Sequence, residues 1–226
     1  MSRQVSRPYF NCCPCTHVPL LLLGQTYVKS GVNRSNVFQF AAVEERAERI
    51  VESAVALAEK GGFEAVRLRD VAADAGVALG TLYRHFRSKE DLLVAALAAE
   101  VTTLEDYLSN NPARGGKPID RVVSVFAVAT SGMCRRPRLA QAILKSVASA
   151  NPDLTEQVAA FHGRIAALTD AALHGPETRS NGNDHSAEAL VLQQVWFASL
   201  VGWAGGLHDQ EAVVSKVRVA AGFVLG

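Results

Sequence analysis

The stretch LRDVAADAGVALGTLYRHF, residues 68–86, constrains the fold of this chain more than any other segment. Its first part has apolar residues at the i, i+3, i+4, i+7 spacing of one buried helical stripe: Leu68, Val71, Ala72 and Ala75. Gly76 can adopt the left-handed backbone that a sharp helix exit needs. A second short helix is expected at residues 79–86. The stretch therefore predicts two helices joined by a tight turn.

The second of these helices is predicted to have a polar outer face. Leu82 and Phe86 are four residues apart and should point inward. The residues left on or near the outer face are Gly80, Thr81, Tyr83, Arg84 and His85. Two short helices with this turn can present the second one to a DNA major groove. Hydroxyl, phenol, imidazole and guanidinium groups can contact phosphates or base edges there.

Basic residues gather around the same stretch, although the chain as a whole is nearly neutral. The 226 residues include 23 Lys or Arg and 22 Asp or Glu, a formal charge of +1. Arg67, Arg69 and Lys89 flank the two helices, and we predict that they contact DNA together with the outer face. A local basic patch is typical of a specific DNA-binding protein. The alternatives are a helical corner of an all-helical protein and an ordinary solvated surface.

The motif also resembles a known family. GVALGTLYRHFRSKEDLL and the upstream run RIVESAVALAEKGGFEAVRLRDVAADAGV are similar to the DNA-binding signature of TetR-family regulators, over about residues 41–101. This resemblance implies a three-helix DNA-binding head, an all-helical ligand-binding body and a homodimer. The chain departs from the family at Val66-Arg67, where members often carry Thr-Val or Thr-Thr as a cap and phosphate contact. Arg67 could supply the phosphate contact by its charge.

The remaining sequence predicts an all-α body. We expect an arm at residues 1–40, a helix-turn-helix head at 41–90 and a ligand-binding and dimerisation bundle at 91–226. The expected helices lie at about residues 42–60, 88–109, 119–133, 139–148, 151–173, 187–207 and 209–225, with loops at 111–118 and 174–185. Gly61-Gly62 should end the first helix, and Ser88 with Asp91 should form a capping box.

The segment VWFASLVGWAGG, residues 195–206, predicts a helix buried on more than one side. Its small residues allow close approach of another helix, so we assign a homodimer interface to Ala198, Gly202, Gly205 and Gly206. A two-fold dimer would also present two heads to two half-sites. The alternative is a monomeric core.

Apolar residues of the body are candidates for a ligand pocket that takes a lipophilic effector. They are Phe126, Met133, Leu144, Val147, Phe161, Ile165, Leu168, Trp196, Leu200 and Trp203. Ordinary core packing is the alternative for each. VWFASLVGW and the preceding CRRPRLAQAI are similar to the KstR group, the sterol-catabolism repressors of actinobacteria. That similarity implies a steroid-derived acyl-CoA effector and control of lipid-degradation genes.

Residues 1–40 lack helical periodicity and hold prolines and the cluster CCPC. The apolar run at 18–23 is interrupted by Pro19, and no small-residue cleavage site follows, so a signal peptide is disfavoured. The run is also too short to span a bilayer. We expect either a disordered arm, which could touch DNA, or a translated leader upstream of the biological start.

The cysteines do not form a pattern of disulfides or metal ligands. Cys12, Cys13 and Cys15 are crowded together and Cys134 is distant, whereas a zinc site needs pairs separated by a longer loop with further ligands. We predict no metal, no cofactor and a reducing, cytoplasmic location without membrane partners.

Two other functions compete with a ligand-responsive repressor of operator DNA. An enzyme would need a base or metal site, but His162, His174, His185 and His208 are scattered and lack HExxH-type spacing. We therefore predict no catalytic residues. An architectural DNA-binding protein without an effector is the second alternative, and a body without a ligand-sized cavity would favour it.

Overall fold

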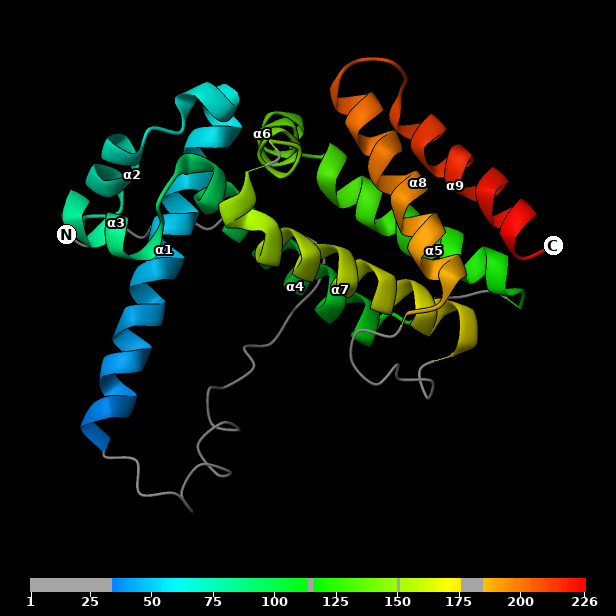
Figure 1. Cartoon of the computed structure of the whole chain (residues 1–226), viewed down its shortest axis with the longest axis horizontal. Coiled ribbons are helices and arrows are strands. Elements are labelled where there is room, and N and C mark those ends of the chain that lie inside the picture. The colour runs from blue at the N-terminus through cyan, green and yellow to red at the C-terminus, as the bar shows by residue number, and fades with distance from the viewer. Residues whose placement is uncertain (1–33, 114–115, 150, 176–184) are drawn as a thin grey trace, which may run out of the picture. The chain divides into compact units, whose positions relative to one another are not determined.

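The computed structural model describes residues 34–113, 116–149, 151–175 and 185–226. The chain divides into two compact units, Met1–Glu44 and Glu45–Gly226, and the elements discussed below belong to the second unit unless stated. All regular structure in the described residues is helical (Figure 1), which confirms the predicted all-α fold. The cluster CCPC and most of the predicted arm lie outside the described residues.

Helix α1, Arg34–Ala65, begins earlier than expected and includes residues 34–40 of the predicted arm. Proline is absent from this whole segment, so nothing in the backbone prevents helix there. The backbone leaves the helical conformation at Gly61 (φ −138°) and Gly62 (φ 67°). The regular helix therefore ends before Gly61, as predicted.

The helix-turn-helix forms as expected, from α2, Leu68–Asp74, and α3, Leu79–His85. Gly76 has a φ of 66°, the left-handed conformation that the turn requires. Two turn hydrogen bonds close the end of α2: the Val77 amide donates to the Ala72 carbonyl at 2.9 Å, and the Gly76 amide donates to the Ala73 carbonyl at 3.3 Å. Leu82 is fully buried and Phe86 is 8% exposed, so both point inward.

The start of α2 lacks a side-chain cap. Arg67 occupies the N-cap position in an extended conformation, and its side chain makes no capping hydrogen bond. The start of α4, Lys89–Asn110, is capped as predicted, because the Ser88 hydroxyl accepts from the Asp91 amide at 3.0 Å. The Asp91 carboxylate in turn accepts from the Arg87 amide at 2.9 Å. That reciprocal bond lies one residue before the position of a standard capping box.

The body contains α5, Pro118–Cys134; α6, Pro137–Val147; a short 3-10 turn, Pro152–Leu154; α7, Thr155–His174; α8, Ala187–Ala204; and α9, Gln210–Val224. Helices α8 and α9 lie side by side, and α9 packs on α5 (Figure 1). Helix α4 packs on α6 and α7 and continues the chain from the predicted head into the body. No helix among the described residues is long and apolar enough to cross a membrane.

Helix α8 ends at Ala204 rather than at residue 207 as expected. Gly206 adopts a φ of 78°. The Leu207 amide donates to the Gly202 carbonyl, and the Gly206 amide donates to the Trp203 carbonyl, each at 2.9 Å. This is the same terminating turn that follows α2, so the glycines that suggested close helix packing also end the helix.

Candidate nucleic-acid interface

Helix α3 separates its buried and exposed side chains cleanly. Leu82 is held in the core, whereas Tyr83 is 52% exposed and Gly80 and Arg84 are exposed. Thr81 and His85 are half-buried, and an Arg84 guanidinium nitrogen lies 3.4 Å from the Thr81 hydroxyl. The helix therefore presents one phenol, one guanidinium and one hydroxyl on a rigid support, groups that can bond phosphates or base edges.

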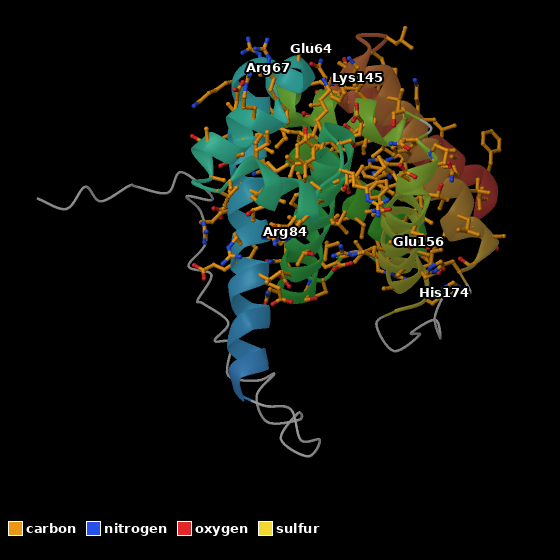
Figure 2. The ribbon with its side chains drawn as sticks, turned by 60° about the vertical axis from the view of Figure 1, so that its left-hand side comes forward. Glu64, Arg67, Arg84, Lys145, Glu156 and His174 are labelled. Carbon is orange, nitrogen blue, oxygen red and sulfur yellow. The ribbon has the colours of Figure 1, made fainter. Side chains whose placement is uncertain are left out.

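Two exposed arginines, Arg67 and Arg69, lie at the start of α2. Figure 2 labels Arg67 and also Arg84 of α3, whose side chain is exposed as well. Arg69 is 81% exposed at its side chain, with Asp70 4.0 Å away. An ion pair this exposed is weak, so Arg69 keeps its capacity to contact a phosphate.

Lys89, at the start of α4, contacts two residues near the end of α1. Its ammonium is 3.7 Å from the centre of the Phe63 ring and 3.5 Å from a Glu64 carboxylate oxygen. The side chain is 28% exposed. Lys89 therefore has partners within the chain, and the predicted DNA-backbone contact stays a prediction.

Arg49 of α1 pairs with Glu45 at 3.6 Å, one turn away. Both side chains are largely exposed, at 46% and 72%, so the pair is weak.

Comparison with known proteins agrees with this geometry. Residues 50–96 match the family model of "Bacterial regulatory proteins, tetR family", and residues 115–223 match "Tetracyclin repressor-like, C-terminal domain". The chain is 34% identical to the HTH-type transcriptional repressor KstR of Rhodococcus jostii, over 82% of this chain and 85% of that protein. The chain belongs to the TetR family. Its resemblance to KstR repressors is likewise confirmed, and these relatives are DNA-binding regulators rather than enzymes.

Other TetR-family relatives extend the likeness. The KstR repressor of Mycobacterium tuberculosis is 30% identical over 82% of this chain and 83% of its own length. A crystal structure of a TetR transcriptional regulator from Rhodococcus sp. RHA1 superposes with a TM-score of 0.70 at 28% identity, covering 80% of this chain and 97% of the other. Thermus thermophilus FadR, in complex with lauroyl-CoA, shares the fold, with a TM-score of 0.62 at 20% identity over 79% of this chain and 93% of that one.

The predicted pocket residues lie in or against the core of the body. Phe126, Leu144, Val147, Phe161, Ile165, Trp196 and Leu200 are buried, and Met133, Leu168 and Trp203 are half-buried. The rings of Phe126 and Trp196 are 5.4 Å apart, and Trp196 Nε1 donates to the Thr130 hydroxyl at 3.0 Å. These contacts fit core packing, and the predicted pocket role stays a prediction.

A small hollow lies between α4, α5 and α6. Its volume is about 10 Å³, room for about one water molecule. Its lining includes Met133 from the predicted pocket, together with Glu100, Gly132, Arg136, Leu139, Ala140 and Ile143. This hollow is far smaller than the roughly 300–1,000 Å³ of typical ligand sites.

The four residues predicted at the dimer interface differ in exposure. Ala198, Gly205 and Gly206 are exposed. Gly202 is buried, and a Cβ at this position would lie 2.8 Å from the His208 ring of the same chain. The small size of Gly202 therefore has an intrachain reason, while its role in a dimer stays a prediction.

His185 contacts a carboxylate of α7. Nδ1 of His185 is 3.2 Å from the Asp170 carboxylate, and the Ser186 hydroxyl donates to the same carboxylate. Because Ser186 faces the carboxylate and also caps α8, the three residues do not form a nucleophile–base pair. Burial raises the pKa of the half-buried Cys134 thiol to about 11, which keeps it protonated near neutral pH. In the part of the chain that the structure describes, no cluster of His, Cys, Asp and Glu could hold a metal ion.

The sequence reasoning missed a junction between the end of α1 and α6. Arg136, at the start of α6, contacts Glu59 of α1 at 3.3 Å and also pairs with Glu100 of α4. At the other end of α6, Lys145 is 2.9 Å from Glu64 and 4.2 Å from the centre of the Phe63 ring. Figure 2 shows the Glu64 and Lys145 labels together. The run CRRPR, which places several cations in an otherwise apolar stretch, is the feature that could have revealed this junction.

Proposed function

We propose that this TetR-family protein is a homodimeric repressor that binds operator DNA through α3 and leaves it when a lipophilic effector binds the body. The observation that carries the DNA step is the exposure of Tyr83 and Arg84 beside the buried Leu82. In this proposal Gly80 admits a close approach to the groove, and Thr81 and Tyr83 contact phosphates. Arg84 contacts a guanine or a phosphate, while Arg67 and Arg69 contact the backbone.

Fluorescence anisotropy with the gene's own upstream region tests operator binding. We expect a specific complex whose affinity falls steeply with salt, because phosphate contacts release counterions. A scrambled duplex of equal length is the control for non-specific binding. Equal affinity for the two duplexes, or no complex at low salt, would reject the proposal.

The homodimer is proposed to form through α8 and α9. The exposed residues of α8 repeat at helical spacing and carry no charge: Ala187, Leu190, Val191, Gln194, Ala198 and Val201. On α9, Val219 is 58% exposed and Phe223 is 85% exposed. Contiguous exposed apolar side chains of this kind mark protein contact sites, and a two-fold pairing buries the same face on both copies.

Sedimentation velocity tests this face directly. Val201→Glu places a carboxylate on the exposed side of α8 and should convert a dimer into monomers. Ala167→Glu adds the same single negative charge at an exposed position of α7, outside the proposed interface, and is the control. A Val201→Glu variant that remains dimeric at micromolar concentration would rule out this interface.

The effector is proposed to be a lipophilic molecule, with a steroid-derived or fatty acyl-CoA thioester as the first candidates. Support comes from the apolar lining of the body, the KstR relatives and the shared fold of a FadR protein in complex with lauroyl-CoA. Because the predicted lining residues are closely packed, an effector must separate them. The effector therefore selects a more open body that is a minor state of the free protein.

Helix α6 is the proposed link from the opened body to the head. It lines the small hollow through Leu139, Ala140 and Ile143, and its charged residues hold the end of α1 through Glu59 and Glu64. A shift of α6 would therefore move or release the head. Operator DNA and the effector would then weaken each other's binding, because the coupling between their sites changes both affinities by the same factor.

Titrating the operator complex with steroid-derived and fatty acyl-CoA thioesters tests the effector step. We expect one class to lower operator affinity at micromolar concentration. The alternative, an effector-independent DNA-binding protein, is favoured by the small volume of the hollow between α4, α5 and α6. It predicts operator binding that no lipophilic compound changes.

A further inference from the structure

A buried amide on α8 is left partly unpaired. Gln193 is 0% exposed. Its Nε2 contacts Nδ1 of His162 on α7, and its Oε1 has no hydrogen-bond partner in the described part of the chain. Buried polar groups are nearly always paired, because an unpaired one loses its bonds to water without replacement. The unpaired oxygen therefore needs an explanation.

The neighbouring polar groups are satisfied within the protein. Trp196, one turn along α8, donates from Nε1 to the Thr130 hydroxyl at 3.0 Å. The Ser199 hydroxyl donates to the Val195 carbonyl at 2.7 Å. Gln193 thus differs from other buried polar residues of its own helix.

The His162 ring that contacts the amide lies beside two aromatic rings. The His162 ring lies 5.0 Å from the Phe161 ring and 5.2 Å from the Phe197 ring, centre to centre. Burial lowers the pKa of His162, so the ring is neutral at pH 7 and offers no cation to an anionic ligand. On α7, the Asp170 carboxylate is already bonded to His185 and Ser186.

We infer that Gln193 Oε1 accepts a hydrogen bond from a hydroxyl group on an apolar ligand that binds between α7 and α8. This inference rests on the proposed function, because the ligand is the effector of the body. A ketone or carboxylate has no proton to donate to Oε1, and a charged amine would lack a counter-ion among these rings. A hydroxyl on a hydrocarbon skeleton meets both requirements.

Three matched probes test the inference on the full chain: 2-naphthol, naphthalene and 2-methoxynaphthalene, titrated by calorimetry. The hydroxyl compound should bind about 3- to 10-fold more tightly than the other two, the ratio that one net hydrogen bond provides. Gln193→Leu should abolish this preference, and Gln193→Met, which keeps the length of the side chain, should do the same. Gln157→Leu makes the same change at an exposed glutamine of α7 and should retain the preference.

A purely structural role for Gln193 gives the opposite results. If the amide serves only to hold His162, the three probes bind equally, or the preference survives in Gln193→Leu; either result overturns the inference. Absence of binding by all three probes also overturns it. Operator binding, measured on the same wild-type preparation, separates the two claims. A protein that binds operator without the hydroxyl preference contradicts only this inference, whereas a protein that does not bind operator contradicts the proposed function.

Discussion

Helices α3 and α8 would serve the proposed function in opposite ways, one through what it exposes and the other through what it buries. The seven residues of α3 bury Leu82 and leave Tyr83 and Arg84 exposed. Helix α8 buries Trp196 and Leu200 and exposes small and aliphatic residues. Exposed polar groups on a short helix indicate what kind of partner the helix can bind. A buried apolar side chain looks the same whether it fills a core or lines a ligand site.

The largest expected effect contrasts Phe126 of α5, which packs against Trp196 of α8, with Tyr83 of α3. Phe126→Ala should lower the free energy of unfolding by about 3–5 kcal/mol, because the side chain is fully buried against Trp196. Tyr83→Ala should change it by less than about 0.5 kcal/mol, because the ring is half exposed. Urea denaturation measures both. A small loss for Phe126→Ala would show that this residue lines a site that adapts to truncation.

The head could be predicted from sequence because its constraints are local. The spacing of Leu68, Val71 and Ala72, the left-handed Gly76 and the Ser88 cap each depend on residues within about one helical turn. The family resemblance then added the DNA-binding role. The partners of Lys89, Phe63 and Glu64, are distant in sequence, so no local pattern indicated these contacts.

The body was predictable only as a set of helices. The apolar residues of α5, α7 and α8 identify buried faces, but pattern alone does not say which helices open around a ligand. Arg136 joins Glu59 to Glu100 across long sequence separations, so no local pattern contains the junction. The same is true of the pairing between Gln193 and His162.

The next largest effect is a loss of operator affinity, and only substitutions in the head should cause it. Arg84→Ala should weaken operator binding by about 1–3 kcal/mol, or roughly 5- to 150-fold, if the guanidinium reads a base. Lys117→Ala removes an exposed cation at the start of α5 and should leave the affinity unchanged. Anisotropy titrations at several salt concentrations measure both variants. A uniform loss across unrelated sequences would instead assign Arg84 to a phosphate.

A smaller effect is expected at the junction between the two regions. Glu59→Gln removes one of the two carboxylates beside Arg136. The Glu59 side chain is 31% exposed and the Arg136 side chain is 26% exposed. The expected loss is about 0.5–1 kcal/mol in the free energy of unfolding, since Glu100 still pairs with the arginine. Glu64→Gln acts at a carboxylate that is 75% exposed and should cost less. Equal urea midpoints for Glu59→Gln and the wild type would show that this ion pair does not stabilise the junction.

The smallest expected effect is a pH dependence confined to the body. Burial lowers the pKa of His162 from its ordinary value of 6.5, so the native state resists a proton that the unfolded chain accepts. The unfolded state therefore binds more protons between the lowered pKa and pH 6.5, and stability falls as the pH drops through that window. His162→Phe should flatten this part of the stability profile. A wild-type profile that His162→Phe leaves unchanged would mean that the pKa of His162 is the same in the native and unfolded states.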